Sequence, residues 1–203
     1  MRIYERVQRL ASESKDIVIL GGPNGAGKTT AARVLLPEFF RLHPFLNADD
    51  FARDLAPESV ESAAIAAGRL LIERMRTFVR EGRSFAMETT CSGKSYVPLL
   101  RQCKASGWRV SLYYFWLPNP EESIARVANR VRHEGHHIPD DVIYRRFKTG
   151  LRNMLELYLP LADNAEIYDN SDRKRILIAE KRDGVAFAVH DLERWARIEE
   201  IAR

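Results

Sequence analysis

A glycine-rich segment at residues 22–30, GPNGAGKTT, has the clearest chemical pattern in the chain, because its first eight residues fit G-x-x-x-x-G-K-[ST]. Glycines let such a loop curl until several backbone N–H groups point at one anion, and the following helix adds its positive end. The lysine of the pattern reaches the β- and γ-phosphates, and the hydroxyl after it ligates Mg²⁺. The sequence therefore predicts a site for ATP and Mg²⁺, with Thr29 as metal ligand and a phosphate cradle made of Gly22, Pro23, Asn24, Gly25, Ala26, Gly27, Lys28, Thr29 and Thr30.

Motifs that would assign this loop to other nucleotide-binding proteins are absent from the sequence. The chain has no N-K-x-D for guanine, no segment like the L-S-G-G-Q of ABC-type ATPases, and no apolar strand ending in the Asp-Glu pair of motor ATPases. These absences favour a small kinase, in which a second substrate accepts the γ-phosphoryl group. The alternative is a nucleotide-dependent switch or nucleic-acid-associated ATPase that phosphorylates no metabolite.

Carboxylates follow the second and third expected strands. Asp49 and Asp50 compete for the role of the base that takes the proton of an acceptor hydroxyl, although one or both could instead cap the following helix. Glu88 is followed by hydroxyls at Thr89 and Thr90, a set that suits a polar acceptor such as a sugar, or outer-shell contacts to Mg²⁺. Ser92 or Thr90 could at the same time cap the next helix.

The net charge of +4 is concentrated in one part of the chain. Between residues 126 and 152, seven Lys and Arg side chains stand against three Asp and Glu, a surplus equal to that of the whole chain. Arg126, Arg130 and Arg132 fall on successive turns of one expected helix, which favours a lid whose arginines neutralise the γ-phosphate. A solvated helical face is the plainer alternative. Nucleic acid is a disfavoured partner, since no recognition motif accompanies the charge.

Strands and helices alternate along the chain in the way that positions such residues at one sheet edge. Hydrophobic patterns predict strands at 16–20, 45–48, 84–87, 108–117, 165–168 and 176–179 and helices at 30–40, 58–80, 96–106, 121–132, 140–158 and from 191. Right-handed crossovers then give an α/β, P-loop NTPase-type three-layer sandwich with a mostly parallel sheet. Ligands bind beyond the carboxyl ends of its strands, where residues 169–171 are a candidate adenine contact.

Length and composition indicate one globular domain. The 203 residues are 45% hydrophobic, and we expect a single domain over 1–203 with a core at about 16–181, a lid at about 126–150 and a C-terminal helix at about 190–202. Mean hydropathy is −0.33, and the longest apolar run is too short for a membrane span or a signal peptide. The sequence therefore predicts a soluble, cytoplasmic protein with no membrane partner.

The ordered set GPNGAGKTT, LNADDFAR, FAMETTCSGKSY, RVRHEGHHIPDDVIYRRF and IYDNS resembles the zeta-toxin family of P-loop kinases. The resemblance implies transfer of phosphate from ATP to a sugar nucleotide such as UDP-N-acetylglucosamine, and a toxin that an antitoxin protein blocks. It implies that Asp49 is the catalytic base and that Lys28, which holds the phosphates, also takes part in catalysis. It implies that Arg130 is a lid arginine, and we expect Arg132 to act together with it. The expected acceptor-binding residues are Asp50, Arg69, Glu88, Thr89 and Thr90.

Overall fold

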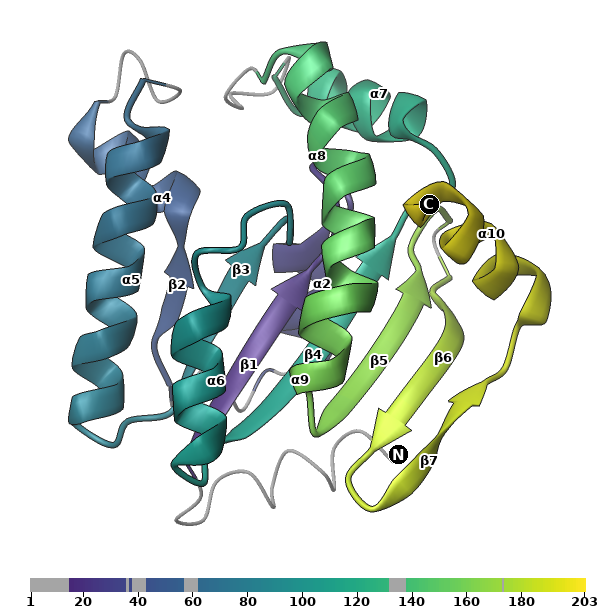
Figure 1. The fold of residues 1–203 in the computed structure, drawn as a ribbon. Helices are drawn as coiled ribbons and strands as arrows, with labels where there is room; N and C mark the ends of the chain where they lie inside the picture. Colours follow the sequence, from purple (N-terminus) through teal and green to yellow (C-terminus); the bar gives the residue numbers. More distant parts are fainter. Residues whose placement is uncertain (1–14, 36, 38–42, 57–61, 132–137, 173) are drawn as a thin grey trace.

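The computed structural model describes residues 15–35, 37, 43–56, 62–131, 138–172 and 174–203. A seven-stranded sheet in the order β2-β3-β1-β4-β5-β6-β7 runs through the molecule (Figure 1). Its first five strands are parallel and its last two antiparallel. The strands are β1 (Asp16–Gly21), β2 (Phe45–Asn47), β3 (Phe85–Thr89), β4 (Arg109–Trp116), β5 (Asn164–Asp169), β6 (Ile176–Arg182) and β7 (Val185–Val189). This arrangement confirms the α/β prediction of a mostly parallel sheet.

Helices fill the connections between the parallel strands, and one more helix follows the last strand. They are α2 (Lys28–Leu35), α4 (Ala48–Leu55), α5 (Ala64–Arg80), α6 (Val97–Ala105), α7 (Pro120–Val131), α8 (Asp140–Asn153), the π-helical turn η1 (Met154–Tyr158), α9 (Leu159–Leu161) and α10 (Leu192–Ala202). The helix predicted over 58–80 begins only at Ala64, and residues 57–61 lie outside the described part. Within the described residues, no helix has both the length and the apolar character needed to cross a bilayer.

The core lies on both faces of the sheet, because successive side chains of a strand point to opposite sides. Ile17 and Ile19 of β1 pack in a large cluster that includes residues of α5, α6, η1 and α10. Val18 and Leu20 pack in a second cluster, which includes residues of α2. Seven of the eight residues of β4 are buried, as a central strand covered on both faces requires.

Parallel pairing brings the ends of three strands to one edge of the sheet. Leu20 of β1 pairs with Glu88 of β3, and Glu88 in turn pairs with Asn47 of β2. The glycine-rich loop after β1 and helix α4 after β2 therefore begin beside Glu88. This edge is where a parallel sheet of this kind binds its ligands.

Candidate active site

The loop between β1 and α2 has the backbone conformation that its glycines permit. Gly22, Gly25 and Gly27 have φ values of +142°, +74° and +72°, which other residues rarely adopt. A Cβ at Gly22 would also lie 2.3 Å from the Phe115 carbonyl oxygen of the neighbouring strand. The side chain of Lys28 is 6% exposed, and its Nζ donates to the Pro23 carbonyl at 2.9 Å, across the loop. The loop thus has the form of a phosphate cradle with its lysine folded inward.

Glu88 lies against the start of α2. Thr29 Oγ1 donates to Glu88 Oε2 at 2.6 Å, and Lys28 Nζ lies 3.6 Å from Glu88 Oε1. The sequence left Glu88 open between the acceptor and Mg²⁺, and the structure places it against the hydroxyl and the amine of the phosphate loop while it also lines the neighbouring cavity. A hydroxyl and a carboxylate that meet at this point offer the hard oxygen ligands that Mg²⁺ prefers beside phosphates. Thr29 and Glu88 are therefore the residues that could hold the metal.

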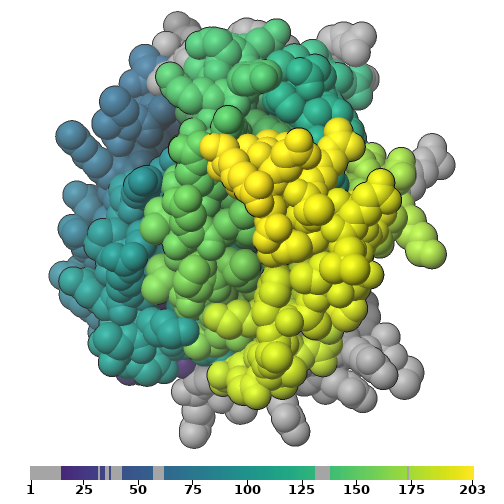
Figure 2. Space-filling model, turned by 45° about the vertical axis from the view of Figure 1, so that its right-hand side comes forward, coloured from purple at the N-terminus to yellow at the C-terminus, as the bar shows by residue number. Residues whose placement is uncertain are grey.

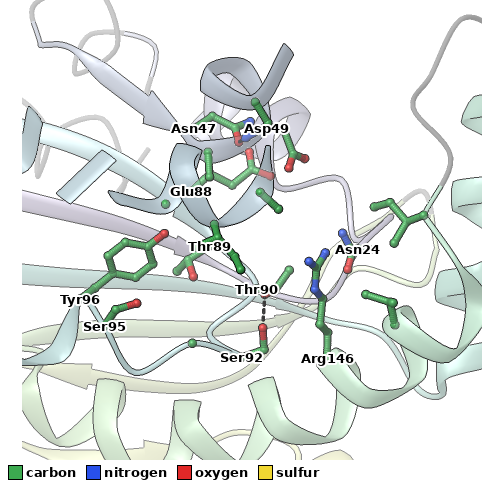
Figure 3. Close-up of a pocket in the computed structure, with 18 of the residues that line it drawn as sticks. Asn24, Asn47, Asp49, Glu88, Thr89, Thr90, Ser92, Ser95, Tyr96 and Arg146 are labelled. Carbon is green, nitrogen blue, oxygen red and sulfur yellow. Dashed lines mark hydrogen bonds between the residues drawn. The ribbon is translucent and has the colours of Figure 1, made fainter. Parts of the chain in front are cut away.

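A cavity of about 500 Å³ adjoins the phosphate loop at Asn24 and Lys28 (Figure 3). This volume lies within the range of small-molecule sites. Its polar residues include Asn47, Asp49, Arg69, Glu88, Thr89, Thr90, Ser92, Ser95, Tyr96 and Arg146, and its apolar residues include Ile65, Ile72, Ile138 and Val142. The cavity therefore extends from the phosphate loop, past two carboxylates, to a mixed wall formed by α5 and α8.

Asp49 and Asp50 have different surroundings at the start of α4. Asp49 lines the cavity. Asp50 is not among the residues that line it, and its 53% exposed side chain is paired with Arg53. The cap of α4 is Asn47, whose side chain accepts from the Asp49 N–H at 3.0 Å. The interpretation of either aspartate as the helix cap is therefore wrong, and the structure does not bring Asp50 to the cavity.

The cavity is lined by Tyr96, which was not predicted from the sequence, and by Asn24, which was predicted as part of the phosphate loop. Burial, and secondarily the charge of Asp49, raises the pKa of Tyr96, so its hydroxyl stays protonated and can donate a hydrogen bond. The Asn24 Oδ1 atom is buried and has no hydrogen-bond partner among the described residues. Buried amides are nearly always paired, and a bound ligand is one way to complete such a group. Only the fold shows that these two side chains face one space.

The loop after β3, residues 90–93, is held by the end of α8 and by η1. Asn153 Nδ2 donates to the Cys91 and Ser92 carbonyls at 2.9 and 3.0 Å, and the Tyr158 hydroxyl donates to the Gly93 carbonyl at 2.8 Å. The Thr89 hydroxyl accepts from the Cys91 N–H at 3.0 Å, so it shapes this turn as well as lining the cavity. Burial raises the pKa of the Cys91 thiol to about 12, which keeps it protonated and unreactive.

Close packing of α8 on this loop predicts opposite effects for two Gly→Ala changes. A Cβ at Gly150 would lie 2.3 Å from the Thr90 carbonyl oxygen, whereas a Cβ at Gly68 in α5 would meet nothing within 4 Å. Gly150→Ala should destabilise the protein by about 2 kcal/mol through overpacking, and Gly68→Ala should stabilise it by up to about 1 kcal/mol through helix propensity. Thermal unfolding should show melting shifts of a few degrees in opposite directions. Equal shifts would contradict this packing of α8.

The arginines expected in a lid are divided between different environments. Arg130 is exposed and does not line the cavity, and Arg132 lies outside the described residues. Arg126 donates to Asn170 and Ser171 carbonyls beside the phosphate loop. Arg146 of α8 is the lid-segment arginine that lines the cavity, and Figure 3 shows its guanidinium group extending from the helix into that space. Of the arginines expected in the lid and described by the structure, Arg146 thus lines the cavity and Arg130 does not. Arg69 also lines the cavity, and its role in acceptor binding stays a prediction.

A phosphate loop after β1, with a carboxylate of β3 against its lysine, is the arrangement of the P-loop kinase fold. A comparison with protein families shows which family within this fold the chain belongs to. The model of the zeta toxin family matches residues 2–182, and the chain belongs to this family. An uncharacterized protein from Haemophilus influenzae is 30% identical over 126 residues, which make up 62% of this chain and 88% of that protein.

Solved structures share the fold. Two structures of the complex of AvrRxo1-ORF1 with AvrRxo1-ORF2 are similar to this chain, with TM-scores of 0.71 for the structure with sulphate ions and 0.70 for the structure with ATP. In both, the identity is 18%, and the match covers 98% of this chain and 67% of the matched chain. The PezAT chromosomal toxin-antitoxin system of Streptococcus pneumoniae gives a TM-score of 0.60 at 20% identity, over 98% and 94% of the two chains. At these identities the likeness concerns the fold alone.

Proposed function

We propose that this chain is an ATP- and Mg²⁺-dependent kinase that transfers the γ-phosphoryl group to a hydroxyl of a small-molecule acceptor. The observation that carries the proposal is the cavity of about 500 Å³ that opens from Lys28 of the phosphate loop and is lined there by Asp49 and Glu88. A protein that only hydrolysed ATP would need space for a water molecule. A cavity of this size beside the phosphate loop supports a second substrate.

The proposed chemistry assigns one task to each group. The N–H groups of residues 22–30 and the Lys28 amine hold the phosphates. Asp49 accepts the proton of the acceptor hydroxyl and directs its oxygen at the γ-phosphorus. The new oxygen–phosphorus bond forms as the bond to the β-phosphate oxygen breaks, and ADP leaves. Arg146, from the opposite wall, neutralises the charge on the transferred group.

Thr29 and Glu88 are the proposed metal-holding residues. When bound there, Mg²⁺ would neutralise negative charge on the phosphates. Glu88 accepts a hydrogen bond from the Thr29 hydroxyl at 2.6 Å, so the two candidate oxygen ligands lie next to each other. Under this proposal Glu88 supports the phosphate side of the site, and Arg69, Thr89 and Thr90 remain candidate contacts to the acceptor.

The acceptor that we propose is a sugar nucleotide, of which UDP-N-acetylglucosamine is the candidate implied by the family. The cavity supports this class because it combines hydroxyl, amide and arginine side chains with an apolar wall of isoleucines. Incubation of the purified protein with ATP, Mg²⁺ and a panel of sugar nucleotides should yield one phosphorylated species in mass spectrometry. A panel without any phosphorylated product would contradict this acceptor class.

A toxin role, with an antitoxin protein as partner, is the proposed biological setting. It is supported by membership of the family and by the toxin-antitoxin system among the structural relatives. Induced expression of the wild type should slow bacterial growth, whereas Lys28→Ala should grow as an uninduced culture does, because the buried amine that contacts the phosphates is lost. Colony counts after induction test this, with immunoblots to confirm equal protein levels. Equal growth of both strains would contradict the toxin role.

A further inference from the structure

The phosphate loop is held from its outer side by residues distant in sequence. Ser123 of α7, which is fully buried, donates its hydroxyl to the Asn24 carbonyl. Asn170, in the turn after β5, donates its Nδ2 to the Ala26 carbonyl at 2.6 Å. A Cβ at Gly27 would lie 3.1 Å from that same nitrogen. The Asn170 side chain thus lies directly against the peptide that joins Ala26 to Gly27.

The hydrogen bond from Asn170 fixes the orientation of this peptide. No peptide bond of the described residues is cis, and in a planar trans peptide the C=O and N–H groups point in opposite directions. Because Asn170 holds the Ala26 carbonyl on the outside of the loop, the Gly27 N–H is turned toward the inside. That is the side on which a phosphate-binding loop presents its donors. Asn170 therefore orients one donor of the phosphate cradle.

The turn that carries Asn170 is itself fixed by a buried carboxylate. Asp169 is 4% exposed, and its Oδ1 accepts from the backbone N–H and the hydroxyl of Ser171 at 2.8 and 2.6 Å. Its Oδ2 accepts from Arg194 Nε at 2.7 Å. Burial raises the pKa of Asp169, but the hydrogen bonds from Ser171 and the pairing with Arg194 outweigh it and lower the pKa below its usual value. The carboxylate is thus charged, and both of its oxygens accept hydrogen bonds.

Arg194 comes from a part of the chain that the family match does not cover. The match ends at residue 182, and β7 and α10 follow it. Helix α10 packs on α8 and β6, and Figure 2 shows the yellow C-terminal segment seated against the green of α8. The Arg194 Nη1 also donates to Asp191, the N-cap of the same helix, at 2.5 Å. The guanidinium group is therefore held in place by its own helix while it pairs with Asp169.

We propose that Arg194 is a positioning residue for nucleotide binding, which acts from α10 through Asp169 and Asn170 on the Gly27 N–H of the phosphate loop. The proposal rests on the proposed function only in that the loop binds ATP. It gives the segment after the family match a role in the site: α10 supplies an outer support for the phosphate cradle. Removal of Arg194 should loosen the 169–171 turn and weaken phosphate binding, although the guanidinium group of Arg194 lies outside the phosphate loop.

Binding of ATP that carries a fluorophore on its ribose tests this proposal. We expect Arg194→Gln and Asn170→Ala each to raise the dissociation constant about tenfold, a coupling of ordinary size between contacting groups. Because the two residues act in series, the double variant should bind about as weakly as Asn170→Ala alone. The titrations should be made well below the melting temperature of each variant, so that unfolding does not contribute to the differences in dissociation constant.

Two control variants distinguish the proposed effect of Arg194 from a general loss of positive charge on α10 and from weaker packing of α10 against α8. Arg197→Gln removes an exposed arginine three residues further along the same helix. Arg152→Gln removes the hydrogen bonds from α8 to the Ala202 and Arg203 carbonyls at the other end of α10. Both should keep the wild-type dissociation constant, and Arg152→Gln should nevertheless lower the melting temperature.

Three results would overturn the proposal. These are wild-type affinity in Arg194→Gln, multiplied effects in the double variant, and equal weakening by Arg152→Gln. A wild-type protein that binds no ATP would overturn this proposal and the proposed function together. If the wild type binds ATP but transfers no phosphate to any acceptor, the kinase proposal fails, while the dissociation constants still support the role of Arg194.

Discussion

Asp49→Asn should lower the rate of phosphoryl transfer by about 10²- to 10⁴-fold, the usual contribution of a general base. The amide has nearly the same shape but cannot take the proton of the acceptor hydroxyl. Asp49 lines the cavity and lies outside the phosphate loop, so the dissociation constant for ATP should stay within about twofold of the wild type. Label transfer from γ-labelled ATP into the small-molecule fraction measures the rate, and nucleotide titration measures the affinity.

Asp50→Asn is the matched control, because it makes the same change one residue further along the same helix turn. Asp50 is exposed and paired with Arg53, away from the residues that line the cavity. Surface ion pairs of this kind contribute little to stability, so activity and melting temperature should both remain close to those of the wild type. Loss of transfer in Asp50→Asn, or its survival in Asp49→Asn, would show that the base has been assigned to the wrong residue.

Arg146→Gln should lower the transfer rate by about 10³-fold or more, the range found where an arginine stabilises the transferred phosphoryl group. The planar guanidinium group is permanently charged and can bond two phosphate oxygens at once, so Arg146→Lys should recover only part of the rate. Single-turnover label transfer at saturating ATP is the suitable measurement, since it reports the chemical step and not product release.

Arg145→Gln and Arg130→Gln are the controls for Arg146. Arg145 is the exposed neighbour on the same helix, and Arg130 is the exposed arginine that the sequence favoured. Both variants should transfer phosphate within about twofold of the wild-type rate. An inactive Arg130→Gln together with an active Arg146→Gln would show that Arg130, and not Arg146, stabilises the transferred phosphoryl group.

The phosphate loop and the strand and helix that flank it could be predicted from the sequence because their signals are local. Residues 22–30 lie between an apolar strand and a helical pattern, and each feature supports the others. The choice between Asp49 and Asp50 depends instead on the phase of α4. That phase is set by Asn47, whose side chain caps the helix and leaves Asp49 on the cavity side. A strand end followed by Asn-Ala-Asp-Asp offers several possible caps, so spacing alone could not decide.

The arginine that faces the cavity could not be chosen from the sequence because its direction follows from distant contacts. Helix α8 is oriented by the close approach of Gly150 to the loop after β3 and by the hydrogen bonds of Asn153 to the same loop. Those contacts join residues about sixty positions apart, and charge counting along the chain does not reveal them. Likewise, residues 169–171 were predicted to contact adenine, whereas their visible contact is with the phosphate loop through Asn170; the adenine contact stays a prediction.

The central claim is that a second substrate, and not water, receives the phosphoryl group. The most direct test incubates the protein with γ-labelled ATP, Mg²⁺ and a deproteinised bacterial metabolite extract, and separates labelled metabolites from free phosphate. The extract supplies many acceptors at once, so the acceptor need not be identified beforehand. We predict that the wild type places most of the label in an organic species, and that Asp49→Asn places almost none there. Label found only in free phosphate, at the same rate with and without the extract, would contradict the account and favour a nucleotide-dependent switch.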